Sequence, residues 1–354
     1  MPIAQTVLPS AGATGAARRA QVIRTSFQAG KHSGEIDFSI VIPAHNRPEQ
    51  LTRCLESIAA LKYPPARFEV IVVDDGSTVD LAPMVVPFLD RIYITLLRQT
   101  NCGPATARNA GAVAATGHYV VFTDDDCRPE RGWLRALADK LAVNPESAVG
   151  GTTANGLPDN LFSTASQAMV DYLYRRWNRD PDDAFFIASN NLAVERACFL
   201  EFGGFDVSFP LAAAEDRELC NRWRSRHGRL VYAPAALVHH FHALSMKSFL
   251  VQHFNYGRGA KVFREVRCRD ATRLPIAPPG SFYPLLIKFA ITRDLSWRGA
   301  LVAMLLGLSQ AVSPLGYLWQ WFASRAQTSP APTSEHSSDT MTRRNAGEIA
   351  SSGQ

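Results

Sequence analysis

The sequence predicts an α/β fold in which a mostly parallel central sheet is flanked by helices. Short apolar runs rich in β-branched residues recur along the first half of the chain, as expected of strands buried on both faces. Amphipathic or Ala-rich stretches separate these runs, and strands that alternate with helices imply right-handed crossovers and a parallel sheet. Polar residues directly follow three of the runs, at the sheet edge where ligands bind in such folds.

The predicted elements of the first half follow in order from residue 38. The strands are expected at residues 38–43 (FSIVIP), 69–74 (EVIVVD), 92–97 and 118–123 (HYVVFT). Pro48 opens the first helix, which carries apolar residues at helical spacing, namely Leu51, Cys54, Leu55, Ile58 and Ala59. Pro104 opens an Ala-rich helix that Gly117 stops, and Pro129 is expected to start a further helix. The second half adds a helix in DRELCNRWRSRHG and a strand in LVYAPAALVHH.

The composition is that of a folded chain and excludes several classes of protein. The 354 residues are 46% hydrophobic and their mean hydropathy of −0.08 excludes a polytopic membrane protein. Six scattered cysteines without a C-x-x-C pair indicate neither a disulfide scaffold nor a thiolate zinc site. The first strand is not followed by G-x-G-x-x-G, and no G-x-x-x-x-G-K-[ST] occurs, which argues against a Rossmann dehydrogenase and a P-loop phosphotransferase.

The ends of the chain differ from its centre. Residues 1–34 and 323–354 are rich in small and polar residues without sustained periodicity, so both are expected to be disordered. Between them we expect an α/β domain at 35–245, with halves at about 35–130 and 131–245. A basic helix is expected at 246–275 and apolar helices at 276–322.

The apolar segment predicts membrane association. Residues 299–322 contain no charged side chain and are long enough to cross a hydrocarbon core of about 30 Å. Tyr317, Trp319 and Trp321 cluster at one end, as in an interfacial aromatic belt. A buried helix pair or a hydrophobic docking face is the alternative.

Three adjacent carboxylates, Asp124, Asp125 and Asp126, close the fourth strand. Such groups repel one another unless a cation or strong donors neutralise them. Carboxylate oxygens suit Mg²⁺ or Mn²⁺, which often binds one or two carboxylates together with substrate phosphates. Helix capping is the alternative, although it needs only one of the three side chains. We therefore favour a metal–diphosphate site.

Five motifs are similar, in sequence and in order, to those of glycosyltransferase family 2. They are FSIVIPAHNR, EVIVVDDGS, NCGPATARNAG, VVFTDDDC and AAAEDRELCNRW, spread between about residues 38 and 265. The resemblance implies the GT-A fold and an inverting, metal-dependent transfer of a sugar from a nucleotide-diphosphate donor to a hydroxyl acceptor. Here the D-x-D motif of such enzymes would be Asp124 and Asp126.

The resemblance places the donor's base and ribose at the ends of the predicted strands. Pro43, His45 and Asn46 would form the loop against the base, and Asp75 would hydrogen-bond it. The alternative for Asp75 is an Asx turn that leads into the following Gly-Ser. Asp124 would hold the ribose, with Asp125 beside it.

The diphosphate would lie between an arginine and a cation. Arg108 matches an arginine that approaches the nucleotide, an exposed helix arginine being the alternative. Asp126, with Asp124, would bind Mg²⁺ or Mn²⁺. His240 matches a histidine that in some relatives completes the metal shell, although His239 and His242 lie beside it in sequence. The cation and Arg108 would offset the charge that builds up on the leaving nucleoside diphosphate.

The resemblance assigns the acceptor side to a second acidic pair, Glu215-Asp216, in the motif AAAEDRELCNRW, and to the residues around it. In the family the aspartate of this pair, here Asp216, is the general base that takes the proton of the acceptor hydroxyl. Glu215 would line the sugar site or complement the helix dipole. Asn190 and Asn191 would line the donor sugar or the acceptor, and Trp223 would be either an acceptor-stacking surface or core.

Two departures from the family bear on function. Processive synthases of the family carry Gln or Arg three residues before an Arg-Trp pair, whereas Leu219 would stand there, before Trp223. The chain also lacks several spans for a translocation channel, so we expect non-processive transfer. A non-catalytic nucleotide- or membrane-binding scaffold of the same fold is the alternative. Nucleic-acid binding is not expected, because the predicted sheet has no basic face interleaved with aromatic residues.

The position of the positive charge favours a membrane partner. The segment between Phe241 and Pro275 holds seven basic and two acidic residues, so its net charge of +5 equals that of the whole chain. It directly precedes the apolar helices, as a positive-inside flank would. We therefore expect the α/β domain on the cytosolic face of the inner or plasma membrane, with a lipid-linked acceptor favoured. A solvated helix face is the alternative for this segment.

Overall fold

The computed structural model describes residues 5–8, 22–27, 35–209, 213–226, 228–269 and 282–328. Most of residues 1–34, and residues 329–354, lie outside these ranges. So do residues 270–281, which include Asp270 and Arg273 of the basic segment. The predictions made for those residues stay predictions.

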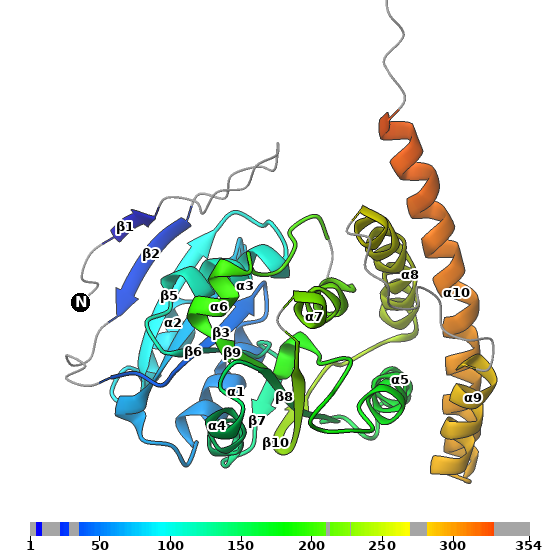
Figure 1. The fold of residues 1–354 in the computed structure, drawn as a ribbon, viewed down its shortest axis with the longest axis horizontal. Coiled ribbons are helices and arrows are strands. Elements are labelled where there is room, and N and C mark those ends of the chain that lie inside the picture. The colour runs from blue at the N-terminus through cyan, green and yellow to red at the C-terminus, as the bar shows by residue number, and fades with distance from the viewer. Residues whose placement is uncertain are drawn as a thin grey trace, which may run out of the picture.

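Ten strands form one sheet in the order β1-β2-β5-β4-β3-β6-β9-β8-β10-β7 (Figure 1). The strands are β1 Gln5–Leu8, β2 Val22–Phe27, β3 Phe38–Ala44, β4 Phe68–Asp75, β5 Tyr93–Gln99, β6 Tyr119–Phe122, β7 Cys127–Pro129, β8 Ala148–Asn155, β9 Leu192–Glu195 and β10 Leu230–His240. The α/β class and all the predicted strands are confirmed. Pro129, expected to start a helix, instead ends the strand β7, and the next helix begins at Trp133. The first two strands lie in residues for which the sequence predicts disorder, and β2 pairs antiparallel with β5.

The sheet is parallel at its centre and mixed towards its sides. β5, β4, β3 and β6 are mutually parallel neighbours, as the alternating pattern predicts. β9 runs antiparallel to both β6 and β8, and β7 runs antiparallel to β10. Only β9 itself runs against its neighbours where the two halves of the sheet meet. β8 and β10 are parallel to each other and point the same way as the central strands, so the predicted, mostly parallel central sheet is confirmed.

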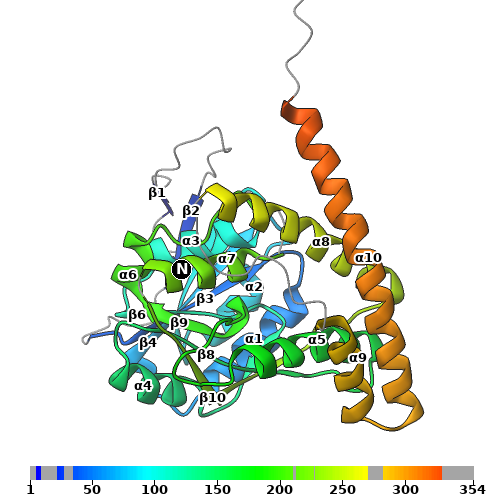
Figure 2. The same cartoon turned by 45° about the vertical axis from the view of Figure 1, so that its right-hand side comes forward.

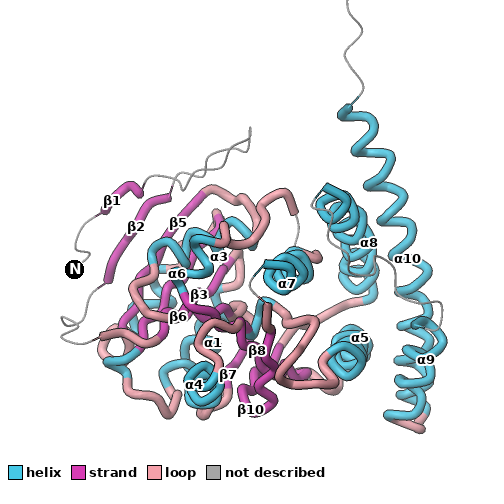
Figure 3. Tube along the Cα trace, viewed as in Figure 1, coloured by secondary structure: helices cyan, strands magenta, loops and turns pink. Residues whose placement is uncertain are grey.

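Helices cover both faces of the sheet and one end of it (Figure 3). They are α1 Pro48–Ala59, α2 Ala82–Val85, α3 Pro104–Ala114, α4 Trp133–Val143, α5 Leu161–Trp177, α6 Arg196–Glu201, α7 Glu215–Arg226, α8 Met246–Arg269, α9 Phe282–Arg293 and α10 Trp297–Thr328. Alternate residues of β3 face opposite cores. Ile40 and Ile42 pack with α1 and α4, whereas Val41 packs with α3 and α7. This two-sided burial explains the continuous apolar runs.

A third core lies under the C-terminal helices, away from the two faces of the sheet. It joins α5, α8, α9 and α10 through residues such as Ala165, Phe249, Leu286 and Leu306. In Figures 1 and 2, α10 runs along the outside of this group and continues past the end of α8. It ends at Thr328, six residues beyond the predicted boundary at 322.

The basic helix α8 is less exposed than its charge suggests. Lys261 is 6% exposed and its ammonium group lies 2.5 Å from Glu265, and Arg267 is 3% exposed with its guanidinium over the Phe263 ring. Lys247 and Arg264 are exposed. The cationic surface of α8 is therefore smaller than the sequence predicts, because part of the charge is used within the fold.

Candidate active site

One cavity of about 720 Å³ opens where the carboxyl ends of β3, β4 and β6 meet the start of α7 and the end of β10. We call it the cleft. Eleven of the fourteen residues singled out in the sequence line it, namely Pro43, His45, Asp75, Arg108, Asp124, Asp125, Asp126, Asn190, Glu215, Asp216 and His240. Parallel strands bring their carboxyl ends to one edge, which is why residues up to 197 positions apart in the sequence meet here.

Arg108 is the buried centre of the polar wall. It projects from α3, is 3% exposed, and donates to Asp124 Oδ1 at 2.7 Å and to Glu215 Oε1 at 3.2 Å. Burial works against the charged guanidinium, but Asp124 and Glu215 outweigh it and raise the pKa of Arg108. An exposed helix arginine is thereby excluded. Arg108 instead joins the acidic motif after β6 to the acidic pair that opens α7.

Arg47 neutralises the other side of the acidic cluster. Its Nη1 lies 3.1 Å from Asp125 Oδ1 and 2.9 Å from Asp126 Oδ2, and its side chain is 43% exposed. Burial raises the pKa of Asp125 to about 7, against the opposing effect of Arg47. The sequence reasoning missed Arg47, although it ends the motif FSIVIPAHNR. The signal that could have identified Arg47 is a cationic side chain just after the carboxyl end of a buried strand.

His240 approaches the same cluster from the end of β10. Its Nε2 lies 3.2 Å from Asp126 Oδ1, a buried atom that accepts no aligned hydrogen bond within the described ranges. Burial would raise the pKa of Asp126, but His240 and Arg47 outweigh it and hold that pKa below its usual range. The neighbouring His242 ring is 5.2 Å away, and burial lowers the pKa of His242 to about 4.

The donor atoms of this corner fit a divalent cation. Asp126 and His240 offer an unpaired carboxylate oxygen and an imidazole nitrogen, and Asp124 lies two residues away on the same turn. These ligands suit Mn²⁺ or Mg²⁺. Cys127 also has its sulfur within 4.8 Å of these two ligand atoms. Burial raises the pKa of Cys127 well above its usual value, so a neutral thiol is a poor ligand for a hard cation.

Asp75 holds the start of α3. Its carboxylate accepts hydrogen bonds from the Gln99 side chain at 2.7 Å and from the N–H groups of Cys102 and Gly103, both at 2.9 Å. The Asx turn into Ser77 is made by Asp74 instead, whose Oδ1 accepts from Ser77 N–H at 2.8 Å. Asp75 lines the cleft with both oxygens engaged by the chain itself.

The acidic pair of α7 forms the opposite wall. Burial and the neighbouring Asp216 raise the pKa of Glu215, against the effect of Arg108. Burial also raises the pKa of Asp216, whose Oδ1 accepts from the N–H of Arg217 at 2.7 Å. Ala214, just before this pair, has φ +72°. A left-handed conformation is costly for alanine, so the surrounding structure fixes the position of the pair.

Three predicted site residues lie outside the cleft lining. Asn46, with φ +54°, ties two loops together, since its Oδ1 accepts from the N–H of Thr78 at 2.8 Å. Asn191 is fully buried: its amide donates to two backbone carbonyls, and its oxygen accepts from the Trp133 indole at 2.8 Å. Trp223 is 2% exposed and packs edge-on against Phe202. The core interpretation is therefore correct for Trp223, and Asn191 braces the sheet.

The far end of the cleft carries apolar side chains together with uncharged polar ones, and it comes from helices without recognisable motifs. α5 contributes Met169, Val170 and Leu173, α8 contributes Tyr256 and Ala260, and α10 contributes Gln310 and Ser313. The sequence reasoning did not find these residues. They lie on helices whose only signal is apolar spacing, which does not distinguish a cavity wall from a core.

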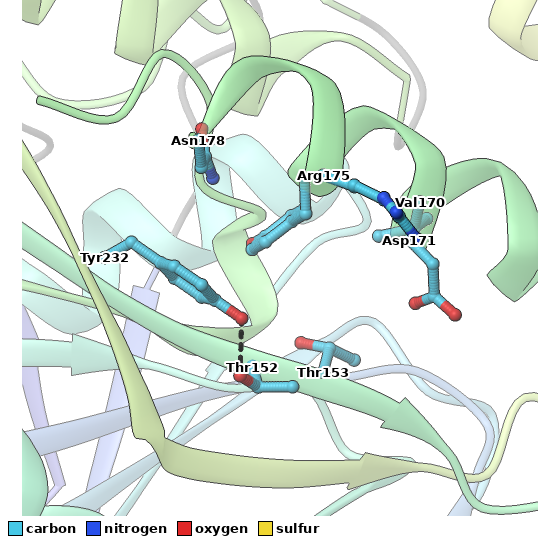
Figure 4. Close-up of a pocket in the computed structure, with 8 residues that line it drawn as sticks. Thr152, Thr153, Val170, Asp171, Arg175, Asn178 and Tyr232 are labelled. Carbon is cyan, nitrogen blue, oxygen red and sulfur yellow. Dashed lines mark hydrogen bonds between the residues drawn. The ribbon is translucent and has the colours of Figure 1, made fainter. Parts of the chain in front are cut away.

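A smaller cavity of about 280 Å³ lies between α5, β8 and β10. Figure 4 shows the residues that line it. Thr153 and Val170 line both cavities. Its polar groups bond to the chain: Tyr232 and Thr152 share a hydrogen bond of 2.6 Å, and Asn178 donates to the carbonyl of Phe186. We regard it as part of the structural support of the cleft.

The family can be decided at this point. Residues 39–202 match the family model described as glycosyl transferase family 2. This segment of the chain belongs to glycosyltransferase family 2. It holds β3 to β9 and the acidic motif after β6, whereas the pair Glu215-Asp216 and His240 lie beyond it.

Curated relatives agree with the assignment to family 2. The pre-mycofactocin glycosyltransferase of Mycobacterium tuberculosis is 30% identical over 278 residues, which cover 76% of this chain and 56% of that protein. The glucosyl-dolichyl phosphate glucuronosyltransferase of Haloferax volcanii is 28% identical over 218 residues, which cover 57% and 68% of the two chains. The chain thus spans little more than half the length of the first of these relatives.

Solved structures share the fold of this chain. A mannosyltransferase from Pyrobaculum calidifontis, in complex with GDP-Man and Mn²⁺, superposes with a TM-score of 0.54 at 19% identity, covering 84% of this chain and 87% of that one. Residues 1–349 of TarS from Staphylococcus aureus superpose with a TM-score of 0.50 at 15% identity, covering 82% and 92%. The predicted GT-A fold is confirmed.

Proposed function

We propose that the chain is a non-processive, inverting glycosyltransferase that moves a sugar from a nucleotide-diphosphate donor to a hydroxyl acceptor. One observation carries the proposal: the buried Arg108 bridges the acidic motif after β6 and the acidic pair of α7 within a single cleft. A donor-binding motif and a candidate base thus face the same space. Membership of family 2 and the nucleotide-sugar ligand of a structure with the same fold support it.

The nucleotide would lie along the polar wall. Pro43 and His45 would contact the base, next to Asp75, and Asp124 would hold the ribose. Arg108 and Arg47 would face the diphosphate, because they are the cationic side chains among the described residues that line the acidic corner. Asn190, whose oxygen accepts from the Thr153 hydroxyl at 3.0 Å, would face the donor sugar.

We propose a single displacement at the anomeric carbon of the donor sugar, with Asp216 as the base. The acceptor oxygen forms a bond to the anomeric carbon while the bond from that carbon to the phosphate oxygen breaks. The electron pair leaves with the nucleoside diphosphate, and the acceptor proton passes to Asp216. The raised pKa of Asp216 makes it a stronger base than an ordinary carboxylate once it is ionised.

Asp126, Asp124 and His240 would hold a divalent cation, Mn²⁺ or Mg²⁺, which offsets negative charge on the leaving group when bound. Arg47 now contacts the carboxylates of this corner and is half-exposed, so it has room to turn towards the phosphates. The mannosyltransferase structure with the same fold holds Mn²⁺ together with its nucleotide sugar.

The acceptor would enter from the apolar end of the cleft. The wall formed by Met169, Leu173 and Tyr256 suits the apolar part of an amphipathic acceptor, such as a lipid-linked one. Within the described ranges one helix, Trp297–Arg325, is long and apolar enough to cross a membrane. We therefore propose membrane association through the C-terminal helices, with the cleft on the cytosolic face.

Asp216→Asn tests the base. Transfer from the donor that gives the largest Mn²⁺-dependent thermal shift in a nucleotide-sugar panel should fall by about 10²–10⁴-fold, with the donor Kd unchanged. Asp139→Asn, an exposed aspartate on α4, is the matched control and should keep full activity. Undiminished transfer by Asp216→Asn would show that another group is the base.

Asp126→Ala tests the cation site by calorimetry, without reference to turnover. Binding of the same donor should lose its dependence on Mn²⁺, because the variant lacks the buried carboxylate. Asp139→Asn again serves as the control. An unchanged Mn²⁺-dependent affinity would contradict the assignment of Asp126 as a ligand.

A further inference from the structure

Helix α10 carries two opposite stripes of residues, each repeating at intervals of four and three. The inner stripe faces the protein and consists of Val302, Leu306, Ser309, Ser313, Gly316 and Gln320. The outer stripe is exposed and consists of Met304, Leu308, Ala311, Leu315, Leu318 and Phe322. This spacing places each stripe along one line of the helix surface.

Along the second half of α10, the side that faces the protein is polar and the side that faces outwards is apolar, the reverse of an ordinary surface helix. The inner stripe there is small or polar: Ser313 donates to the carbonyl of His253 at 3.0 Å, and Arg258 donates to Gln320 at 3.0 Å. A Cβ added at Gly316 would lie 1.9 Å from the carbonyl oxygen of Phe254, so the two helices touch through their backbones. The outer stripe, by contrast, is wholly apolar. A helix with its polar side inside and its apolar side outside is not arranged to face water.

The exposed apolar surface of the molecule is concentrated on this side. Of the eighteen large hydrophobic residues that are exposed within the described ranges, ten lie between Leu285 and Phe322. The other eight are scattered over the remaining surface, and six of them precede α8. Leu295 and Trp297, in and next to the turn between α9 and α10, are 85% and 70% exposed. Scattered apolar residues are ordinary, but a continuous patch indicates an interaction surface.

The charges around the outer stripe fit an anionic lipid surface. α10 carries Arg298 and Arg325 near its two ends and no acidic residue, and Lys288 of α9 is exposed. The acidic side chains at this end are Asp294, exposed in the turn before α10, and Asp159, 3.8 Å from Arg298. Trp319 lies at the edge of the stripe with the Arg258 guanidinium 4.3 Å from its ring centre. Tryptophan and cationic side chains are typical of the interfacial region of a bilayer.

The packing of α10 excludes a crossing of the bilayer in this structure. The inner stripe contacts α8 as far as Gln320, and α8 carries Arg258, Lys261 and Arg264 on the adjoining turns. A spanning α10 would draw these charged side chains into the hydrocarbon core, at several kcal/mol for each one placed near its centre.

We propose that α10 lies in the plane of the membrane, with its outer stripe inserted among the headgroups of an anionic bilayer and its inner stripe still packed on α8. The inference deepens the membrane association proposed above and rests on it, but not on the transferase activity. In this arrangement α10 does not span the membrane. Only its outer stripe contacts the lipid, as in interfacial amphipathic helices.

Vesicle flotation of the full chain tests the outer stripe. Binding to phosphatidylcholine vesicles that contain phosphatidylglycerol should fall at least tenfold in the double variant Leu315→Glu/Leu318→Glu. The matched control is Val86→Glu/Val143→Glu, which places the same charges at exposed valines away from α10 and should bind like the wild type. Equal binding by all three proteins would overturn the role of the outer stripe.

Labelling of sealed membrane vesicles from expressing cells distinguishes the in-plane from the spanning arrangement. In a Cys268→Ser background, Leu295→Cys and Ser324→Cys place a cysteine near each end of α10. An impermeant maleimide should label both from the same side. Labelling of the two ends from opposite sides would overturn the in-plane arrangement and leave membrane association standing. A chain that stays soluble as a dimer would overturn both, whereas transfer measured in detergent tests the catalytic proposal separately.

Discussion

The two walls of the cleft are held by different forces. The polar wall, from the loops after β3, β4 and β6, is fixed by ion pairs and hydrogen bonds around Arg108 and Asp75. The apolar wall, from α5, α8 and α10, is fixed by side-chain packing and by backbone contacts at Gly257 and Gly316. The difference shows that electrostatic complementarity organises the polar wall, whereas shape organises the apolar wall. Substitutions in the two walls should therefore fail in different ways.

The largest effect is expected at Arg108, the centre of the polar wall. Arg108→Leu leaves Asp124 and the buried Glu215 without their cation, and loss of one partner of a buried ion pair costs about 3–5 kcal/mol of unfolding free energy. Arg135→Leu removes an exposed ion pair on α4 and should cost less than about 1 kcal/mol. Chemical denaturation measures both. Equal losses would show that the polar wall is not held by this pair of contacts.

A pH-dependent effect is expected at Asp125, also in the polar wall. Burial raises its pKa from 3.8 to about 7, so the folded state favours the protonated form. The resulting stabilisation is present below the unfolded pKa and is lost as the pH rises through about 7. In metal-free buffer with a chelator, Asp125→Asn should therefore gain stability relative to the wild type between pH 5 and pH 7, by of the order of 1 kcal/mol per pH unit. Thermal melts at several pH values measure the difference, and a constant difference would contradict the shift.

A smaller effect is expected in the apolar wall. Gly316→Ala places a methyl group against the carbonyl of Phe254, and overpacking of this kind costs about 1–3 kcal/mol. Gly307→Ala, nine residues earlier in the same helix, meets nothing within 4 Å and should be neutral or slightly stabilising. Limited proteolysis of α10 should follow the same order. If both variants behaved alike, the backbone contact would not be what holds the helix.

The same contrast between the walls explains what the sequence could reveal. Arg108, Asp124 and Asp216 occur in short motifs, so the sequence alone indicates them, and the structure brings them to one cleft. The parallel centre of the sheet was also predictable, because strands buried on both faces appear in the sequence as continuous apolar runs. Asn191 shows the limit: its amide serves two carbonyls and an indole from other elements, and no local pattern distinguishes that role from ligand binding.

Other features depended on contacts between distant segments. Arg47 meets Asp126, 79 positions later, and Trp223 packs against Phe202 from the turn after α6. The strand β2 lies in a segment that looks disordered by composition, yet the open edge of β5 accepts it. The stripes of α10 were present in the sequence as one long apolar run. Only the position of α8 shows which face is turned outwards.

The position of α10 links two binding events, one in the cleft and one at the membrane surface. Gln310 and Ser313 on its inner side line the cleft, while Leu308 and Leu315 point away from it, and a helix is only about 10 Å across. Under the in-plane arrangement, one helix separates the apolar end of the cleft from the lipid. Any shift of this helix changes both surfaces, so their binding free energies are coupled, and such coupling is reciprocal. The factor by which an amphiphile in the apolar end changes the affinity for vesicles must equal the factor by which vesicles change the affinity for the amphiphile.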